Sequence, residues 1–157
     1  MSKGKSRTGL YAAIIIIVII VIVIGVVVAL MMNQPAPSNA IQLTLYAGQV
    51  STSSYGFGNS ASSITSPGPT LNLKVGQTYM MTVTNAGTMP HAWEIMAQKA
   101  TGSQVLFGAQ IATSSYLAPG TSGSVTFTPN QSGNFYYICA VPGHVALGMW
   151  GNVVVTS

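Results

Sequence analysis

The chain has 157 residues, of which 48% are hydrophobic and only 4% are charged, and its net charge is +4 at pH 7. Because three of the five cations lie within the first seven residues, this positive charge does not indicate binding to nucleic acid. The chain contains one Cys and two His, which excludes a metal centre that needs many His ligands.

A membrane-spanning pattern comes first along the chain. Residues 10–32 consist only of apolar residues, Gly and Tyr. At 1.5 Å rise per residue, about 23 residues reach across a hydrocarbon core of ~30 Å, so we expect one transmembrane helix there. Lys3, Lys5 and Arg7 precede this segment, and no charged residue follows it before Lys74. This asymmetry places residues 1–9 in the cytoplasm and the C-terminal part on the extracytoplasmic side of the cell membrane.

The alternative interpretation of this segment is a cleaved secretory signal. Residues 38–40, Ser-Asn-Ala, offer small residues that suit a cleavage site, but the apolar cores of signals usually run to only about 7–15 residues. We therefore favour a retained anchor and a single-pass membrane protein. Both interpretations export the C-terminal domain, so they differ only in whether it is tethered.

Residues 33–40 contain two Pro among small and polar residues, which predicts a short extended linker. Residues 41–157 are then the size of one domain. Their short, regularly spaced apolar runs predict an all-β sandwich. The expected strands cover residues 41–47, 70–75, 78–84, 91–96, 104–108, 122–128, 135–140 and 152–156.

Turn signals separate several of these runs. Gly76-Gln77 predicts a tight hairpin turn between the second and third expected strands, and residues 129–133 predict a turn before the strand that contains the Cys. The Ser- and Gly-rich residues 48–69 are expected to hold either an extra strand or a surface loop. Asn130-Gln-Ser matches the glycosylation triplet on one of these turns, which makes Asn130 a possible acceptor.

Three candidate metal ligands lie close together near the C-terminus, in the stretch CAVPGHVALGM of residues 139–149. Cys139, His144 and Met149 supply a thiolate, an imidazole and a thioether, which are the donor types of a blue-copper site. Such a site needs a second His, and His91 is the only other one in the chain. Zinc would need a fourth strong ligand, for which the chain offers only the carboxylate of Glu94.

Each of these residues also has an ordinary structural interpretation. Cys139 could be a buried strand cysteine, His144 a turn residue and Met149 a core residue. Each of these is individually the commoner case for its residue type. The spacing of the three residues, together with His91, favours the metal site.

The sequence resembles the cupredoxins, the family of type 1 blue copper proteins, in three motifs. These are GNFYYIC at residues 133–139, VPGH at 141–144 and GMWGNVVV at 148–155. Four residues separate Cys139 from His144 and His144 from Met149, a spacing similar to that of rusticyanin and sulfocyanin. The resemblance covers about the last 90 residues well and residues 41–66 poorly.

The resemblance implies a Greek-key β-sandwich that binds one type 1 copper ion. His91, Cys139 and His144 would be the equatorial ligands and Met149 the axial one. The sequence departs from the family at Ala92, since many cupredoxins have Asn or Ser after the first His. Hydrogen bonding around the Cys sulfur affects the redox potential of the copper, so we do not expect this protein to share the high potential of rusticyanin. Backbone N–H groups could still reach the sulfur.

The exported part has very few charges, because Lys74, Lys99 and Glu94 are its only charged side chains. An ordinary domain is about a quarter charged. A domain with a single carboxylate loses little folding stability when acid protonates its carboxylates. We therefore infer that it faces an acidic exterior, as in an acidophile. A low charge could equally be inherited from the lineage without any such role.

These observations predict a membrane-anchored electron carrier, not an enzyme, in an extracytoplasmic respiratory chain. Its partners would be redox proteins, a cytochrome or a terminal oxidase complex, that dock on an apolar patch around His144. We expect this patch to comprise Pro142, Val145, Ala146 and Leu147. The alternatives are an exported protein that binds and delivers copper, and an accessory subunit of a terminal oxidase complex.

Overall fold

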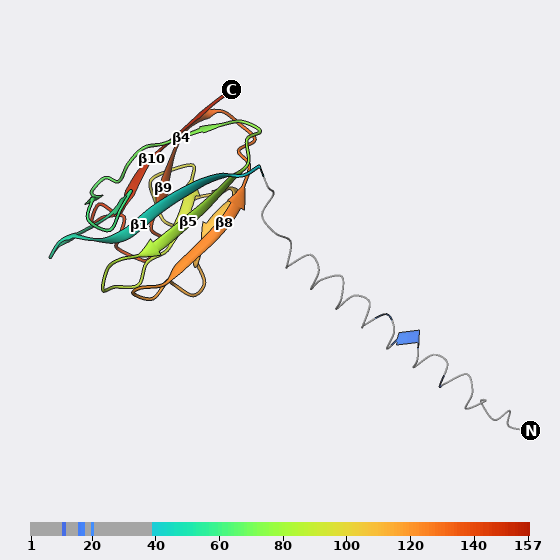
Figure 1. Ribbon diagram of the computed structural model, residues 1–157, viewed down its shortest axis with the longest axis horizontal. Coiled ribbons are helices and arrows are strands. Elements are labelled where there is room, and N and C mark those ends of the chain that lie inside the picture. The colour runs from blue at the N-terminus through green and yellow to red at the C-terminus, as the bar shows by residue number, and fades with distance from the viewer. Residues whose placement is uncertain (1–10, 12–15, 18–19, 21–38) are drawn as a thin grey trace, which may run out of the picture. The chain divides into compact units, whose positions relative to one another are not determined.

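The computed structural model describes residues 11, 16–17, 20 and 39–157. Within them, ten strands form two five-stranded sheets that pack face to face (Figure 1). The first sheet has the strand order β3-β2-β1-β5-β8, and the second has the order β4-β10-β9-β6-β7. The predicted all-β sandwich is therefore confirmed. The strands are β1 Ile41–Ser51, β2 Ser54–Gly58, β3 Ile64–Thr65, β4 Leu71–Lys74, β5 Tyr79–Asn85, β6 Trp93–Met96, β7 Val105–Ile111, β8 Ser122–Phe127, β9 Gly133–Ile138 and β10 Trp150–Thr156.

Alternating side chains fill the space between the two sheets. In β5, Tyr79, Met81 and Val83 are buried, whereas the residues between them are only half-buried. A strand has a period of two residues, so one face of each sheet supplies the core and the other faces outward. The same buried core includes Cys139 and Met149, two of the predicted metal ligands.

The prediction of a hairpin at Gly76-Gln77 is wrong. The strands on either side, β4 and β5, belong to different sheets, since β4 pairs in parallel with β10 and β5 pairs with β1 and β8. The turn itself exists, with Gly76 at a positive φ of 76°, and it carries the chain from one sheet to the other. The backbone N–H of Lys74 donates a hydrogen bond to the Tyr79 hydroxyl at 2.9 Å, which closes this corner.

The Ser- and Gly-rich residues 48–69 contain more regular structure than the sequence pattern indicated. Strand β1 continues to Ser51, and β2 turns back to pair with it in antiparallel register. The short β3 then adds to the outer side of β2. The first sheet is thus widened by a small hairpin that ends near residue 66.

The predicted strand 91–96 begins later than expected. Regular pairing starts at Trp93, and His91 instead forms an isolated antiparallel bridge with Leu117. Its backbone N–H donates to the carbonyl of Leu117 at 3.1 Å, and the N–H of Leu117 donates back at 2.7 Å. This bridge fixes the backbone of His91 beside the sheet.

The predicted transmembrane segment, residues 10–32, and the linker, residues 33–40, fall almost entirely outside the described residues. Four residues of the segment are described, and they are helical: Tyr11, Ile16, Ile17 and Ile20. Across the described part of the chain, no helix is both long enough and apolar enough to cross a membrane. All ten strands belong to one compact unit, Ala36–Ser157.

Candidate metal centre

The four predicted ligands come from two connections between strands. His91 lies between β5 and β6, and Cys139 directly follows the end of β9. His144 and Met149 lie in the connection from β9 to β10, which we call the ligand loop, residues 139–149. Neighbouring strands hold both connections, because β6 pairs with β9 and β9 pairs with β10.

The structure brings His91, Cys139 and His144 together at one buried point. The Nδ1 atoms of the two imidazoles are 3.3 Å apart, and the Sγ of Cys139 is 3.5 Å from the Nδ1 of His144. One donor atom from each of the three residues lies within 4.8 Å of the others. His91 and Cys139 are fully buried, and His144 is only 6% exposed.

Met149 is fully buried at the end of the same loop. Its backbone N–H donates to the carbonyl of His144 at 3.0 Å, and its carbonyl accepts a hydrogen bond from the N–H of Cys139 at 3.1 Å. The loop is therefore closed on itself by backbone hydrogen bonds between the three residues that carry candidate donors. This closure fixes the relative positions of the backbone at the three residues.

The Cys139 sulfur accepts a hydrogen bond from the backbone N–H of Ala92 at 3.3 Å. The expectation that a backbone N–H reaches the sulfur in place of an Asn or Ser side chain is confirmed. Burial raises the pKa of the Cys139 thiol to about 11, although the N–H groups of Ala92 and Val141 act in the opposite direction. Because burial disfavours the thiolate so strongly, a metal cation is needed to hold it deprotonated.

The pKa values of both imidazoles are lowered, which favours their neutral form. Burial, and then the charge of His144, lowers the pKa of His91 to about 4. Burial also lowers the pKa of His144. Neutral imidazole nitrogens have a lone pair available for a metal, so both shifts favour metal binding over protonation at these two side chains.

This donor set fits copper. One thiolate and two imidazoles match a type 1 copper site, whereas a closed zinc site would need a fourth strong ligand. The carboxylate of Glu94 does not join the cluster, which among the described residues contains only His91, Cys139 and His144.

Two residues that sequence analysis missed support the site. Asn85 is fully buried, and its side-chain Nδ2 donates to the carbonyls of Met89 and Leu117 at 2.8 and 2.9 Å. Its Oδ1 accepts from the N–H of Gly87 at 2.9 Å, so this amide holds the connection that carries His91. An Asn just before the turn-rich stretch Ala-Gly-Thr-Met-Pro was the only sequence signal for this role.

Tyr55 is the second missed residue. Its ring stacks on the imidazole of His144 with 4.4 Å between centroids and 22° between planes. It also meets the ring of His91 edge-on at 5.7 Å. Tyr55 lies in the stretch that the sequence left unassigned, and no local pattern links it to a residue almost 90 positions away.

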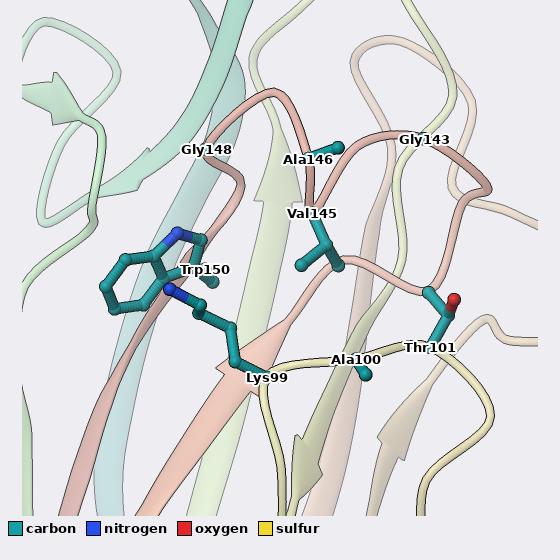
Figure 2. A pocket seen from close by; sticks show the side chains of 8 residues that line it. All are labelled: Lys99, Ala100, Thr101, Gly143, Val145, Ala146, Gly148 and Trp150. Atoms are coloured by element: carbon teal, nitrogen blue, oxygen red, sulfur yellow. The ribbon is translucent and has the colours of Figure 1, made fainter.

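The surface beside the ligand loop is largely apolar. Pro142, Ala146 and Leu147 are exposed, and Val145 is half-buried. On one side the loop borders a hollow of about 520 Å³, into which Val145 projects (Figure 2). Lys99 lines this hollow beside Trp150, with its Nζ 3.9 Å from the centroid of the Trp150 ring.

A β-sandwich with a buried Cys and two His at the end of adjacent strands defines a cupredoxin-type copper domain. The comparison with known families agrees, because the model for copper binding proteins of the plastocyanin/azurin family matches residues 67–156. The chain belongs to this family and is a copper-binding protein.

Individual relatives are similar over shorter stretches. Auracyanin-B of Chloroflexus aurantiacus is 46% identical over 46 residues, which is 29% of this chain and 20% of that protein. The copper-containing nitrite reductase of Alcaligenes xylosoxydans xylosoxydans is 38% identical over 95 residues, 57% of this chain and 27% of that protein. The chain thus spans less than a third of the length of either relative.

The fold is similar to that of solved cupredoxins. An auracyanin B structure superposes with a TM-score of 0.57 at 19% identity, covering 80% of this chain and 95% of the other. This likeness supports the cupredoxin fold.

Proposed function

We propose that this protein is a membrane-anchored type 1 copper protein that carries single electrons outside the cytoplasmic membrane. His91, Cys139 and His144 would be the equatorial ligands and Met149 the axial one. The observation that carries the proposal is the convergence of three buried donor atoms within 4.8 Å in a chain of the copper-binding family. Bound copper would supply the redox change between Cu(I) and Cu(II).

The protein's contribution is a rigid, dry ligand frame. Cys139, His144 and Met149 are held by backbone hydrogen bonds within the ligand loop, and His91 is held by its bridge to Leu117. A frame that does not rearrange suits both oxidation states of copper, so little reorganisation accompanies electron transfer. The exposed apolar residues around His144 would form the docking patch for a redox partner.

The proposed relatives, environment and partners of the protein rest on the spacing of the ligands and on the charge of the domain. Four residues between Cys139 and His144, and four between His144 and Met149, support a relationship to rusticyanin and sulfocyanin. The low charge of the domain supports a function in an acidic exterior. The partners would be a cytochrome or a terminal oxidase complex of a respiratory chain. With almost no charges to steer encounter, docking would depend mainly on apolar contact.

The membrane anchor is supported by sequence. Residues 10–32 form an uninterrupted apolar run after a basic N-terminus, which predicts one span with the copper domain outside. The described residues of this run, Tyr11, Ile16, Ile17 and Ile20, are helical and have exposed side chains. Exposed apolar side chains on a helix suit contact with lipid.

Copper delivery is the alternative function, and the site geometry makes it less favourable. A donor that hands over copper needs open access to its ligands, whereas His144 is only 6% exposed and the other ligands are fully buried. An enzyme of the nitrite reductase or multicopper oxidase type would need further His ligands, which the chain lacks. An accessory role within an oxidase complex stays compatible with electron transfer.

Visible absorption and EPR of the Cu(II)-loaded protein test the proposal, with Cys139→Ser as the control. An intense thiolate-to-copper band and a narrow copper hyperfine splitting, both absent from the control, are expected. Reversible electrochemical cycling without loss of copper would separate an electron carrier from a delivery protein. A colourless protein that holds only Cu(I) or zinc would contradict the electron-carrier function.

A further inference from the structure

A segment from outside the matched family region lies against the ligand loop. Residues 54–68, which we call the clasp, contain β2, β3 and the chain up to Gly68. The family model matches residues 67–156, so nearly all of the clasp precedes it. The contacts of the clasp with the ligand loop therefore have to be argued from this structure and not from the family match.

Three hydrogen bonds join the clasp to the ligand loop and the residue after it. The N–H of Tyr55 donates to the carbonyl of Leu147 at 3.0 Å, and the hydroxyl of Ser66 donates to the carbonyl of Gly148 at 3.0 Å. The N–H of Gly68 donates to the carbonyl of Trp150 at 2.8 Å. These bonds hold the part of the loop that lies between His144 and β10.

The ring of Tyr55 completes this arrangement on the imidazole itself. The two rings are nearly parallel, 22° apart, with centroids 4.4 Å from each other. The Tyr55 N–H bond to Leu147 fixes the backbone from which the ring projects. A half-buried aromatic ring thus lies against the face of His144, the ligand nearest to solvent.

We propose that Tyr55 is a positioning residue of the copper site, which fixes the plane of the His144 imidazole and opposes its departure from the metal. This inference rests on the proposed function, because it requires His144 to be a copper ligand. The ring provides the contact, so phenylalanine should replace tyrosine here. The clasp hydrogen bonds act in the same direction by holding the loop that carries His144.

The size of the effect follows from the strength of aromatic pairs. Loss of one stacked pair should speed the opening of the His144 side of the site roughly 2- to 12-fold. The change should appear in the copper site itself and not in the stability of the sandwich. Tyr46 in β1 offers a matched control, because it is also half-buried in the first sheet.

The test compares Tyr55→Leu, Tyr55→Phe and Tyr46→Leu in the full-length, copper-loaded protein. Release of Cu(I) to a chelator, the reduction potential and the EPR hyperfine splitting are measured, together with urea unfolding. We expect faster copper release and shifted spectra for Tyr55→Leu alone. The inference is overturned if Tyr55→Leu matches the wild type or Tyr46→Leu, or if Tyr55→Phe behaves like Tyr55→Leu.

A second variant keeps the inference testable if Tyr55→Leu does not fold. Ser66→Ala removes only the hydroxyl bond to Gly148, and Ser62→Ala, an exposed serine of the same segment, is its control. Ser66→Ala should speed copper release relative to Ser62→Ala, and equal rates would contradict the clasp. A wild-type protein without the blue band would instead refute the proposed function.

Discussion

Acidification should destabilise the metal-free protein through the buried imidazole of His91. Burial, followed by the charge of His144, lowers the pKa of His91 from 6.5 to about 4. A group with a lowered pKa binds fewer protons in the folded state, so its stabilising contribution is complete above pH 6.5 and is lost as the pH falls toward 4. At about 1.36 kcal/mol per pKa unit, the loss is about 2 kcal/mol at pH 5 and about 3 kcal/mol at pH 4.

Urea unfolding of the metal-free protein, followed by tryptophan fluorescence at pH 7, 5 and 4, measures this loss. With a urea dependence of about 1–2 kcal/mol per molar, the midpoint should fall by roughly 1–2 M between pH 7 and pH 5. His91→Gln should show a much smaller fall, and His144, whose pKa burial also lowers, accounts for the remainder. An unchanged wild-type midpoint, or an equal fall in His91→Gln, would refute the reasoning.

Three further predictions concern other parts of the domain. Burial raises the pKa of Glu94 above 4.5, so ionisation of its carboxylate opposes folding above pH 4.5 and does so fully above its folded pKa. Glu94→Gln should therefore raise the urea midpoint at pH 7 but not at pH 3, and an equal rise at both pH values would contradict this. Met149→Leu should keep copper but raise the reduction potential in voltammetry, whereas loss of copper would argue against a weak axial ligand. A Cβ at Gly151 would press on the ring of Tyr137, so Gly151→Ala should cost about 1–3 kcal/mol in thermal unfolding, and Asn152→Ala, at an exposed neighbour, much less.

The metal cluster could be predicted from the sequence because its donors are scarce. With one Cys and two His in the chain, a site that needs all three can only be His91, Cys139 and His144. Their meeting also requires that the β5–β6 connection lies beside the end of β9, which the cupredoxin resemblance supplied. The sequence predicted that a backbone N–H could donate to the sulfur but did not identify Ala92 as the donor, because residue type does not determine backbone hydrogen bonds.

Strand positions were predicted well where apolar and polar residues alternate, as in β5 and β10. The pairing of those strands was harder to predict. The turn at Gly76 has the same local chemistry in a hairpin as in a corner between two sheets, so the sequence around it could not show that β4 pairs with β10. In the same way, the many Ser and Gly residues from 48 to 69 concealed β2 and β3, whose order comes from pairing with β1.

The stacking of Tyr55 on His144 was the hardest feature to predict. It gives the pairing of β1 with β2 a role in the metal site. The ligand loop closes on itself through backbone hydrogen bonds of Met149 and Cys139, but these bonds hold the backbone and do not contact the imidazole of His144. β1 and β2 place an aromatic ring on that side, and the clasp ties the loop beyond it to Ser66 and Gly68. A domain with so few charges therefore holds its outermost ligand by ring stacking and neutral hydrogen bonds, whose strength does not change as carboxylates become protonated.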